Sequence, residues 1–327
     1  MSRAIVIRKP GGIEALKMED VPIRKLGAEE VLIRQTVLGL NYRDVYQRTG
    51  HYTIDAATPV PGFEGVGTVE SIGSDVSGFK VGDRVACVTL PDGAYAEHRI
   101  VDQSHLIAVP DDISDEMAAA VLAKGLTAHY LLFRTFAVQE MHTILVHAAA
   151  GGVGHILCQW AKHLGARVIA TVGSSTKVEA AKATGADSVI DLSKEDLVDR
   201  VLDATGGEGI TVAYDGVGKD TFMDSLRCLM PLGLMVSYGQ ASGPVPPFDV
   251  SALSDNCLFL TRPNLFLYKS NKMELVLSEN EVFEMIRRRV IKIKLNKRYK
   301  FSEEGVREAH TDLESRKTSG ASIIVLE

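Results

Sequence analysis

Residues 144–154 read ILVHAAAGGVG, and this stretch decides the fold of the second half of the chain. A short apolar run leads directly into three alanines and then into Gly151, Gly152 and Gly154. Residues this small give up side-chain packing, so the turn suits a group that approaches the main chain closely. The apolar positions that follow fall on one face of a helix: Val153, Ile156, Leu157, Trp160, Ala161 and Leu164.

The segments around this turn form a strand–helix–strand unit. Thr143–His147 is the first predicted strand, Gly165 ends the helix, and Arg167–Thr171 is the second strand. The pattern then repeats, with strands predicted at 188–190, 210–214, 234–238 and 257–261 and helices at 177–184, 195–204 and 221–230. Six strands with helices between most of them predict an α/β fold with a doubly wound parallel sheet.

The first 110 residues follow a different pattern. Short alternating runs, separated by glycine and aspartate, occur at 31–37, 67–72, 81–88 and 94–101. This spacing predicts a β-rich, barrel-like first domain over residues 1–123. The second domain is predicted over 124–265. Residues 266–327, which end in the strand-like run 322–326, are expected to fold back and complete the first domain.

Composition and charge exclude several classes of protein. With 46% hydrophobic residues and 6% aromatics, the composition is typical of a globular protein and not of a disordered chain. A formal net charge of −6 argues against a protein whose whole surface binds a polyanion such as nucleic acid. The absence of any long apolar run argues against a spanning helix, and the strand-like start argues against a signal peptide. The cysteines are scattered and are expected to be free thiols in a reducing cytoplasm: Cys87, Cys158, Cys228 and Cys257.

The glycine turn matches the pattern A-x-G-x-x-G, with Ala149, Gly151 and Gly154 at its three special positions. The first position permits the tight turn, the second lets a pyrophosphate approach the backbone, and the third lets the helix pack closely on the strand. The helix N-terminus directs N–H groups and a positive dipole end at the anion. A purely structural turn is the alternative, and the surrounding strands and helix favour dinucleotide binding.

The end of the second strand indicates which dinucleotide binds. An NAD site normally places an acid about twenty residues after the glycines, whereas residues 171–177 read TVGSSTK and contain none. A carboxylate about 4 Å from the 2′-phosphate would cost roughly 1–4 kcal/mol, and Lys177 makes that interaction attractive. A solvated Lys177 at the start of the next helix is the alternative. The missing acid favours NADPH.

Several segments together resemble the medium-chain dehydrogenase/reductase superfamily: PGFEGVG at 61–67, VGDRV at 81–85, KGLT at 124–127 and the glycine motif. Within it, four segments resemble the zinc-free quinone oxidoreductases, the zeta-crystallin-like branch: LNYRDVYQRTGHY at 40–52, HAAAGGVG at 147–154, YDGVG at 214–218 and ESRKTSG at 314–320. The likeness spans essentially the whole chain. It implies a GroES-like catalytic domain joined to a Rossmann domain with a six-stranded parallel sheet, and a cofactor in the cleft between them.

The resemblance also implies the residues of the site. Asn41, Arg43 and Tyr46 would line the nicotinamide end of the cofactor, and Tyr52 would face the substrate. The other cofactor contacts carried over by matching motif are Thr127, Tyr130, Gly151, Gly152, Val153, Gly154, Gly173, Ser174, Lys177, Tyr238, Gly239, Gln240, Ser242, Arg262 and Arg316. Two positions depart from relatives. Leu192 stands where a tyrosine is frequent, which removes a phosphate hydrogen bond, and Gly216 stands where a small hydroxyl residue is frequent.

The residues argue against a catalytic zinc. Zinc relatives carry a histidine just before the glutamate of the G-x-E-x-x-G segment, where this chain has Phe63. A catalytic zinc needs three protein ligands, and the nine histidines include no close metal-type pair. The four-cysteine lobe of those relatives is also missing. His147, beside the alanines, is interpreted as a satisfied strand residue. The prediction is that no metal is bound.

Without zinc, little polarises an alcohol, so reduction of a ready electron acceptor is the easier reaction. It needs the nicotinamide close to the acceptor and a donor to the oxygen that gains charge. Asn41, Tyr46 and Tyr52 are the catalytic candidates, because a phenol keeps its proton at neutral pH; simple packing of both tyrosines is the alternative. The prediction is an NADPH-dependent quinone reductase. The alternatives are a reductase of α,β-unsaturated ketones or aldehydes, and an NADPH-binding RNA-associated or regulatory protein with little turnover.

Two further stretches bear on partners. Residues 287–300 read RRRVIKIKLNKRYK and invite a nucleic-acid hypothesis, but apolar Ile291, Ile293 and Leu295 alternate with polar residues. That alternation favours a strand with one solvated face. The strand at 256–262 is too apolar for an exposed edge. The resemblance implies that it pairs with its own copy in a homodimer, and a strand covered by a loop is the alternative.

Overall fold

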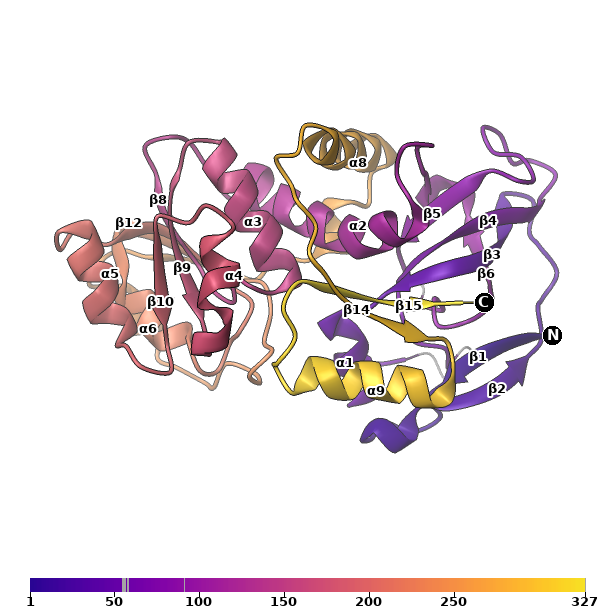
Figure 1. Ribbon diagram of the computed structural model, residues 1–327, viewed down its shortest axis with the longest axis horizontal. Coiled ribbons are helices and arrows are strands. Elements are labelled where there is room, and N and C mark those ends of the chain that lie inside the picture. The colour runs from indigo at the N-terminus through magenta and orange to yellow at the C-terminus, as the bar shows by residue number, and fades with distance from the viewer. Residues whose placement is uncertain (55–56, 58, 91, 327) are drawn as a thin grey trace. The chain divides into compact units, whose positions relative to one another are not determined.

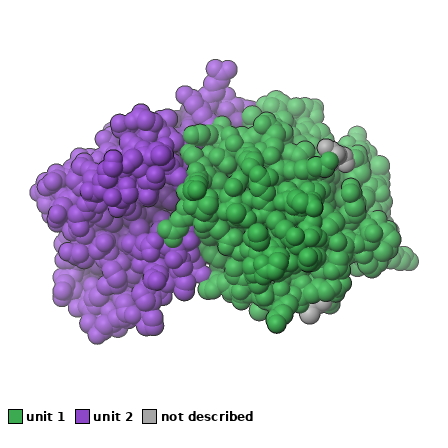
Figure 2. All heavy atoms as spheres, turned by 60° about the horizontal axis from the view of Figure 1, so that its bottom comes forward, with its two compact units in different colours: residues 1–123, 269–280, 293–327 green, residues 124–268, 281–292 purple. Residues whose placement is uncertain are grey.

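The computed structural model describes residues 1–54, 57, 59–90 and 92–326. Two compact units account for the chain and are coloured separately in Figure 2. Unit 1 comprises residues 1–123, 269–280 and 293–327, and unit 2 comprises residues 124–268 and 281–292. The predicted division gave all of 266–327 to the first domain, whereas the structure groups residues 266–268 and 281–292 with unit 2.

Unit 2 contains a six-stranded parallel sheet in the order β10-β9-β8-β11-β12-β13, which confirms the predicted doubly wound sheet. Its strands are β8 (Thr143–Val146), β9 (Arg167–Val172), β10 (Ser188–Asp191), β11 (Ile210–Asp215), β12 (Leu229–Ser237) and β13 (Phe259–Thr261). The strand order reverses between β8 and β11. In open α/β sheets, ligands bind at the carboxyl ends of the strands beside such a reversal.

Helices cover both faces of this sheet. Those of unit 2 are α3 (Gly152–His163), α4 (Val178–Lys182), α5 (Leu197–Thr205), α6 (Phe222–Arg227) and α7 (Leu265–Tyr268). Figure 1 shows α3 and α4 on one side of the sheet and α5 and α6 on the other. Leu157 and Trp160 on the predicted apolar face of α3 are buried, and Gly165, with φ +86°, follows the helix as expected.

Unit 1 is β-rich, as the turn spacing predicts. A seven-stranded sheet has the order β14-β15-β3-β4-β5-β7 with β6 paired to β3, and β1 and β2 form a separate hairpin. The strands are β1 (Ser2–Val6), β2 (Lys17–Val21), β3 (Glu30–Gly39), β4 (Glu64–Ile72), β5 (Arg84–Val88), β6 (His98–Asp102), β7 (Leu106–Ala108), β14 (Leu295–Lys300) and β15 (Ala321–Val325). Helices α1 (Tyr42–Arg48) and α9 (Glu303–Glu314) belong to this unit, while α2 (Asp115–Tyr130) and α8 (Lys272–Arg287) contribute residues to both.

The C-terminal segment is part of the unit 1 sheet. β15 runs antiparallel to β3, with Ile324 opposite Leu38. Phe301 and Val306, which flank the start of α9, are buried in one core with Leu38 and Ile5 of the N-terminal strand. Residues near the two ends of the chain therefore stabilise the same core.

The basic segment 287–300 is a strand over its second half only. Arg287 ends α8, Arg289 takes a left-handed φ of +57°, and β14 begins at Leu295. The strand predicted from the alternation that begins at Ile291 is therefore wrong for residues 291–294, where the segment crosses from one unit to the other before β14 begins.

Two of the basic side chains in the second half of that segment, Lys297 and Arg298, pair with acidic side chains of their own unit. Lys297 Nζ lies 2.6 Å from Glu308 and 3.1 Å from Asp312, and Arg298 lies 2.7 Å from Glu116. A polyanion would have to displace these carboxylates. Across the described part of the chain, no helix is long and apolar enough to cross a membrane.

Candidate cofactor and substrate site

The chain passes from β8 into α3 through a turn held by its own backbone. The Ala149 N–H donates to the Thr171 carbonyl at 3.0 Å, and the Gly151 N–H donates to the Ala148 carbonyl at 2.8 Å. Ala148 has φ +51°, a left-handed conformation that alanine rarely adopts and that clusters at functional turns. Gly151 is the N-cap of α3 and carries no side chain, so the first-turn N–H groups stay directed at a ligand position.

The glycines of this turn have different surroundings. A methyl group on Gly154 would lie 2.4 Å from the Ala148 carbonyl oxygen, so glycine is required for the helix to approach the turn. The atoms nearest to a methyl on Gly152 would belong to the flexible side chain of Lys124, the first at 2.9 Å. Val153 lies between them in the same first turn. This cradle of bare main chain at a helix N-terminus fits the diphosphate of a dinucleotide.

A buried polar network lies beneath the turn. His147 Nδ1 is 2.9 Å from Thr171 Oγ1, and its Nε2 is 2.8 Å from Ser225 Oγ. Ser225 Oγ donates to the Thr221 carbonyl at 2.7 Å, so it accepts from His147 Nε2–H, and Nδ1 accepts from Thr171. Burial lowers the pKa of His147, in keeping with a neutral ring. Both ring nitrogens are engaged, as expected for a satisfied strand residue.

Gly173, Ser174 and Lys177 follow the carboxyl end of β9. Ser174 is the N-cap of a short 3-10 turn, Ser175–Lys177, and its Oγ accepts the Thr176 N–H at 3.4 Å. A methyl on Gly173 would meet nothing within 4 Å. The side chain of Leu192 packs against the unit 2 core, so this position adds no polar group.

The residues after β12 lie at the same edge of the sheet. The N–H groups of Tyr238 and Gly239 both donate to the Asp215 carbonyl, at 2.9 and 3.2 Å. A methyl on Gly216 would lie 2.8 Å from Cζ of Tyr238. The tyrosine ring therefore lies where a side chain at position 216 would extend.

Three predicted cofactor residues are also bonded within unit 2. Arg262 donates to the Gly239 carbonyl and to Gln240 Oε1, both at 3.0 Å. Ser242 Oγ donates to the Val217 carbonyl at 2.7 Å and accepts the Asp220 N–H at 3.0 Å. These bonds shape the loop after β12, and contact of Arg262, Gln240 or Ser242 with a cofactor stays a prediction.

Thr127 and Tyr130 lie on the last turn of α2. The Tyr130 ring stacks on that of Tyr268, with centroids 4.6 Å apart and planes at 10°. Tyr130 is only 2% exposed, whereas Thr127 is half-buried. A π-helical turn follows at Leu131–Thr135, a feature frequent at functional sites.

In unit 1, Asn41 is the N-cap of α1, and its N–H donates to the Asp44 carboxylate at 2.8 Å. Its side-chain amide donates to Glu64 Oε2 at 2.7 Å, while Glu64 Oε1 accepts the Ala123 N–H at 2.7 Å. Glu64 is 1% exposed. The Glu64 carboxyl group therefore fixes the orientation of the Asn41 side-chain amide.

Arg43, Tyr46 and Tyr52 gather in one aromatic cluster. The Tyr46 and Tyr52 rings meet edge to face with centroids 5.4 Å apart, and the Arg43 guanidinium lies 4.8 Å from the Tyr52 ring centre. Arg43 also pairs with Asp92 at 3.8 Å, and Phe63 lies on another side of its guanidinium at 5.8 Å. The structure thus brings these three predicted residues together.

A buried polar network anchors α1 to α9. Tyr95 Oη donates to Asp44 Oδ2 at 3.0 Å and lies 3.2 Å from His310 Nε2. Burial raises the pKa of Asp44 to about 7 and lowers that of His310 to about 3. Buried Arg48 pairs with Glu314 at 2.6 Å. The network fixes the helix that carries Arg43 and Tyr46.

Arg316 follows the end of α9 with a left-handed φ of +56°. Its guanidinium lies beside the Tyr42 hydroxyl; burial raises the pKa of Tyr42, and Arg316 partly offsets this. Arg316 therefore lies at the start of α1, beside Tyr42, whose neighbours in the chain are Asn41 and Arg43. Its predicted contact with the cofactor is not tested by these positions.

The donor set does not fit a catalytic zinc. Over residues 1–54, 57, 59–90 and 92–326, no group of three or more His, Cys, Asp or Glu side chains is arranged to hold a metal ion. Phe63 is buried at the position of the zinc relatives' histidine. Cys87 is buried too, and its Sγ accepts from Arg99 at 3.1 Å.

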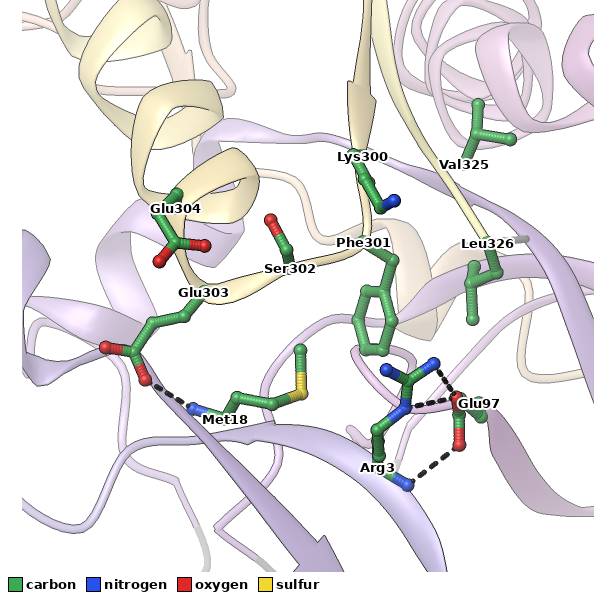
Figure 3. Close-up of a pocket in the computed structure, with 10 residues that line it drawn as sticks. All are labelled: Arg3, Met18, Glu97, Lys300, Phe301, Ser302, Glu303, Glu304, Val325 and Leu326. Atoms are coloured by element: carbon green, nitrogen blue, oxygen red, sulfur yellow. Dashed lines mark hydrogen bonds and ion pairs between the residues drawn. The ribbon is translucent and has the colours of Figure 1, made fainter.

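A cavity of about 330 Å³ in unit 1 lies elsewhere (Figure 3). Its lining residues are Arg3, Met18, Glu97, Lys300, Phe301, Ser302, Glu303, Glu304, Val325 and Leu326, none of them a predicted site residue. Arg3 is paired with Glu97, and Glu303 accepts the Met18 N–H at 2.9 Å. Its charged groups are thus largely satisfied by the protein itself.

Sequence reasoning missed the groups that support the site. Glu64 stands in the quoted PGFEGVG segment, and only its bond to Asn41 gives it a role. Lys124 stands in KGLT, and only the fold places its side chain against Gly152. The Asp44–Tyr95–His310 network has no sequence signal, because its members are far apart in the chain.

Comparison with known proteins agrees with this architecture. The family "Alcohol dehydrogenase GroES-like domain" matches residues 27–111, and "Zinc-binding dehydrogenase" matches residues 152–277. A quinone oxidoreductase of Pseudomonas aeruginosa is 43% identical over 99% of this chain and 100% of its own length. A 2-haloacrylate reductase of a Burkholderia species is 38% identical over 99% of both proteins.

Among solved structures, Escherichia coli quinone oxidoreductase complexed with NADPH is 39% identical, with a TM-score of 0.95 and 99% of both chains covered. The two family matches, the full-length relatives and this structural likeness agree with the GroES-like and Rossmann parts seen in the two units. The chain belongs to the quinone oxidoreductase family of the medium-chain dehydrogenase/reductase superfamily.

Proposed function

We propose that this protein reduces quinones with NADPH. The observation that carries the proposal is the cradle at residues 151–154, together with the absence of an acid at the end of β9 and the presence of Lys177 in the turn that follows. A relative of 39% identity and nearly identical fold is known in complex with NADPH. The bare N-terminus of α3 would receive the diphosphate, and Ser174 and Lys177 would receive the 2′-phosphate.

The reduced nicotinamide, when bound, supplies the hydride. The protein's own task is to hold that ring against the acceptor, exclude water and stabilise the charge that develops on the acceptor oxygen. Asn41, Arg43 and Tyr46 would contact the nicotinamide end. Tyr52, with its ring packed against Tyr46 and Arg43, would donate its hydroxyl proton in a hydrogen bond to the acceptor oxygen.

The reaction is proposed to be zinc-independent, since the donor set of the described residues does not fit a metal. The protein is proposed to be a cytoplasmic homodimer joined through the edge strand β13. Phe259 and Leu260 of that strand are 59% and 39% exposed, an apolar edge that favours pairing. An RNA role is not favoured, because Lys297 and Arg298 are paired with acids of unit 1.

A second candidate reaction is reduction of a C=C bond conjugated to a carbonyl or carboxylate. The observation that favours it is the 38% identity to a 2-haloacrylate reductase over the full length. Both reactions deliver a hydride to an electron-poor conjugated acceptor and stabilise negative charge on an oxygen of that acceptor, so the same donors would serve.

Acceptor-dependent oxidation of NADPH tests the proposal. Purified protein treated with a chelator is supplied with NADPH and either 1,4-benzoquinone, 9,10-phenanthrenequinone or a panel of enones and acrylates. Turnover with the quinones that survives chelation is expected. Turnover confined to the enones or acrylates would assign the second reaction, and cofactor binding without turnover on any acceptor would refute both.

A further inference from the structure

The carboxyl end of β10 carries a carboxylate that the cofactor site described above does not use. Asp191 is the last residue of β10 and lies opposite Val172, the last residue of β9. It is 5% exposed. In a site for NAD the acid stands at the end of the second strand itself; here the acid stands one strand further out, and the end of β9 has none.

Asp191 binds serines from two different loops. Ser175 Oγ, from the loop after β9, donates to Asp191 Oδ2 at 2.5 Å. Ser193 Oγ and N–H, from the loop after β10, donate to Oδ1 at 2.6 and 3.0 Å. Hydrogen bonds to an ionised group are about twice as strong as neutral ones. These donors lower the pKa of Asp191, so the carboxylate is charged at neutral pH.

Ser175 and Lys177 share one 3-10 turn, whose N-cap is Ser174. A bond that fixes Ser175 therefore fixes the backbone from which Ser174 and Lys177 project. The Asp191–Ser175 bond thus ties this turn directly to the end of β10, in addition to the chain connections of the turn to β9 and α4.

We propose that Asp191 is a positioning residue for the 2′-phosphate of NADPH: it holds the turn 173–177 against the end of β10 and so presents Ser174 and Lys177 to the phosphate. An acid at the end of β9 would repel the 2′-phosphate, whereas Asp191 at the end of β10 is proposed to favour its binding by holding Ser175. This inference rests on the proposed NADPH specificity and assigns a residue that the resemblance does not.

A purely electrostatic role for Asp191 predicts the opposite change in NADPH affinity when Asp191 is removed. If Asp191 acted on the phosphate through its charge alone, its removal would relieve repulsion and tighten NADPH binding. If it acts through Ser175, its removal loosens the turn and weakens NADPH binding. NADH has no 2′-phosphate, so its binding should change little in either case. The NADPH-to-NADH ratio therefore separates the two effects from a general loss of stability.

The test measures dissociation constants of NADPH and NADH by nucleotide fluorescence, together with KM and kcat, for wild type, Asp191→Ala, Asp191→Asn, Ser175→Ala and the Asp191→Ala/Ser175→Ala pair. We expect the preference for NADPH to fall about tenfold in Asp191→Ala, the effect of losing a hydrogen bond to a charged group, with kcat unchanged. Ser175→Ala should reproduce most of the loss, and the double variant should add little to either.

Asp187→Asn is the matched control, because Asp187 precedes the other end of β10 and binds Lys162 at 2.8 Å. It should lower stability without changing the nucleotide ratio. An unchanged or increased NADPH preference in Asp191→Ala, or full additivity with Ser175→Ala, would overturn the inference, as would a wild type that binds both nucleotides equally. Failure of the wild type to bind NADPH at all would instead refute the proposed function.

Discussion

Separate replacement of Gly152, Gly154 and Gly173 by alanine distinguishes packing from ligand binding. Gly154→Ala places a methyl group 2.4 Å from the Ala148 carbonyl oxygen and 2.9 Å from two further backbone atoms. Carbon and oxygen atoms not bonded to each other rarely approach within about 3.2 Å, so helix or turn must shift by about 0.8 Å. Backbone atoms cannot rotate away as a side chain does.

The magnitude follows from two opposing effects. Overpacking of this kind costs about 1–3 kcal/mol, and alanine in a helix recovers roughly 0.5–1 kcal/mol relative to glycine. The midpoints of these ranges, about 2 and about 0.75 kcal/mol, leave a net loss of about 1.3 kcal/mol for Gly154→Ala, which lowers Tm by about 3–5 °C in a domain of this size. Gly152→Ala displaces only the Lys124 side chain, and Gly173→Ala meets nothing, so both should stay within about 0.5 kcal/mol of wild type.

Thermal unfolding and nucleotide titration on the same samples give the result. Gly152→Ala should keep its Tm and yet bind NADPH about tenfold or more weakly, because its methyl enters the first turn, where the diphosphate is proposed to lie. Gly173→Ala is the control for stability. A Gly154→Ala protein as stable as wild type would refute the packing argument. A Gly152→Ala protein with unchanged NADPH affinity would refute the placement of the diphosphate.

Four further outcomes are expected. Lys177→Glu should raise the NADPH dissociation constant by about ten- to a hundredfold and leave that of NADH nearly unchanged, since two like charges replace an attraction; equal losses for both nucleotides would contradict this. Burial lowers the pKa of His310 to about 3, below the value of 6.5 for the unfolded chain. Because the unfolded state takes up the proton first, the free energy of unfolding should fall as pH drops from 6.5 toward 3. Urea titrations should show a smaller fall for His310→Gln, and an equal fall would refute the assignment. Phe259→Lys should convert a dimer to a monomer in light scattering, and a wild-type monomer would contradict the proposed edge pairing. Tyr52→Phe should lower kcat for quinones by about tenfold or more while NADPH affinity stays the same, and an unchanged kcat would leave Tyr52 a packing residue.

The sequence predicted those parts of the fold that depend on local pattern. The glycine turn, the apolar face of α3 and the six parallel strands follow from spacing alone, because a buried parallel strand and an amphipathic helix each leave a periodic signature. Residues 291–294 show where local pattern alone fails to predict a strand. Their alternation of burial resembles a strand, yet no neighbouring strand pairs with the segment until Leu295, and pairing is a tertiary property.

The site residues also fall into those that sequence spacing identifies and those whose role depends on tertiary contacts. Gly151, Gly154 and Lys177 are recognisable because their spacing from a strand end carries the chemistry. Arg262 was assigned to the cofactor, but the structure adds bonds from its guanidinium to the loop after β12 that no sequence pattern shows. Asp191 carries no such signal, since the role of an acid at the end of a short outer strand depends on its bond to Ser175, which only the fold shows.

Calorimetric titration of the folded protein with NADPH and with NADH shows whether residues 151–154 and Lys177 form an NADPH site. The diphosphate is proposed to lie on the bare first turn at 151–154, with the 2′-phosphate beside Lys177. We expect one nucleotide per chain, with NADPH bound at least about tenfold more tightly than NADH and that preference weakening as salt is added. Absence of NADPH binding by folded protein, or an NADH affinity equal to or above it, would contradict the account.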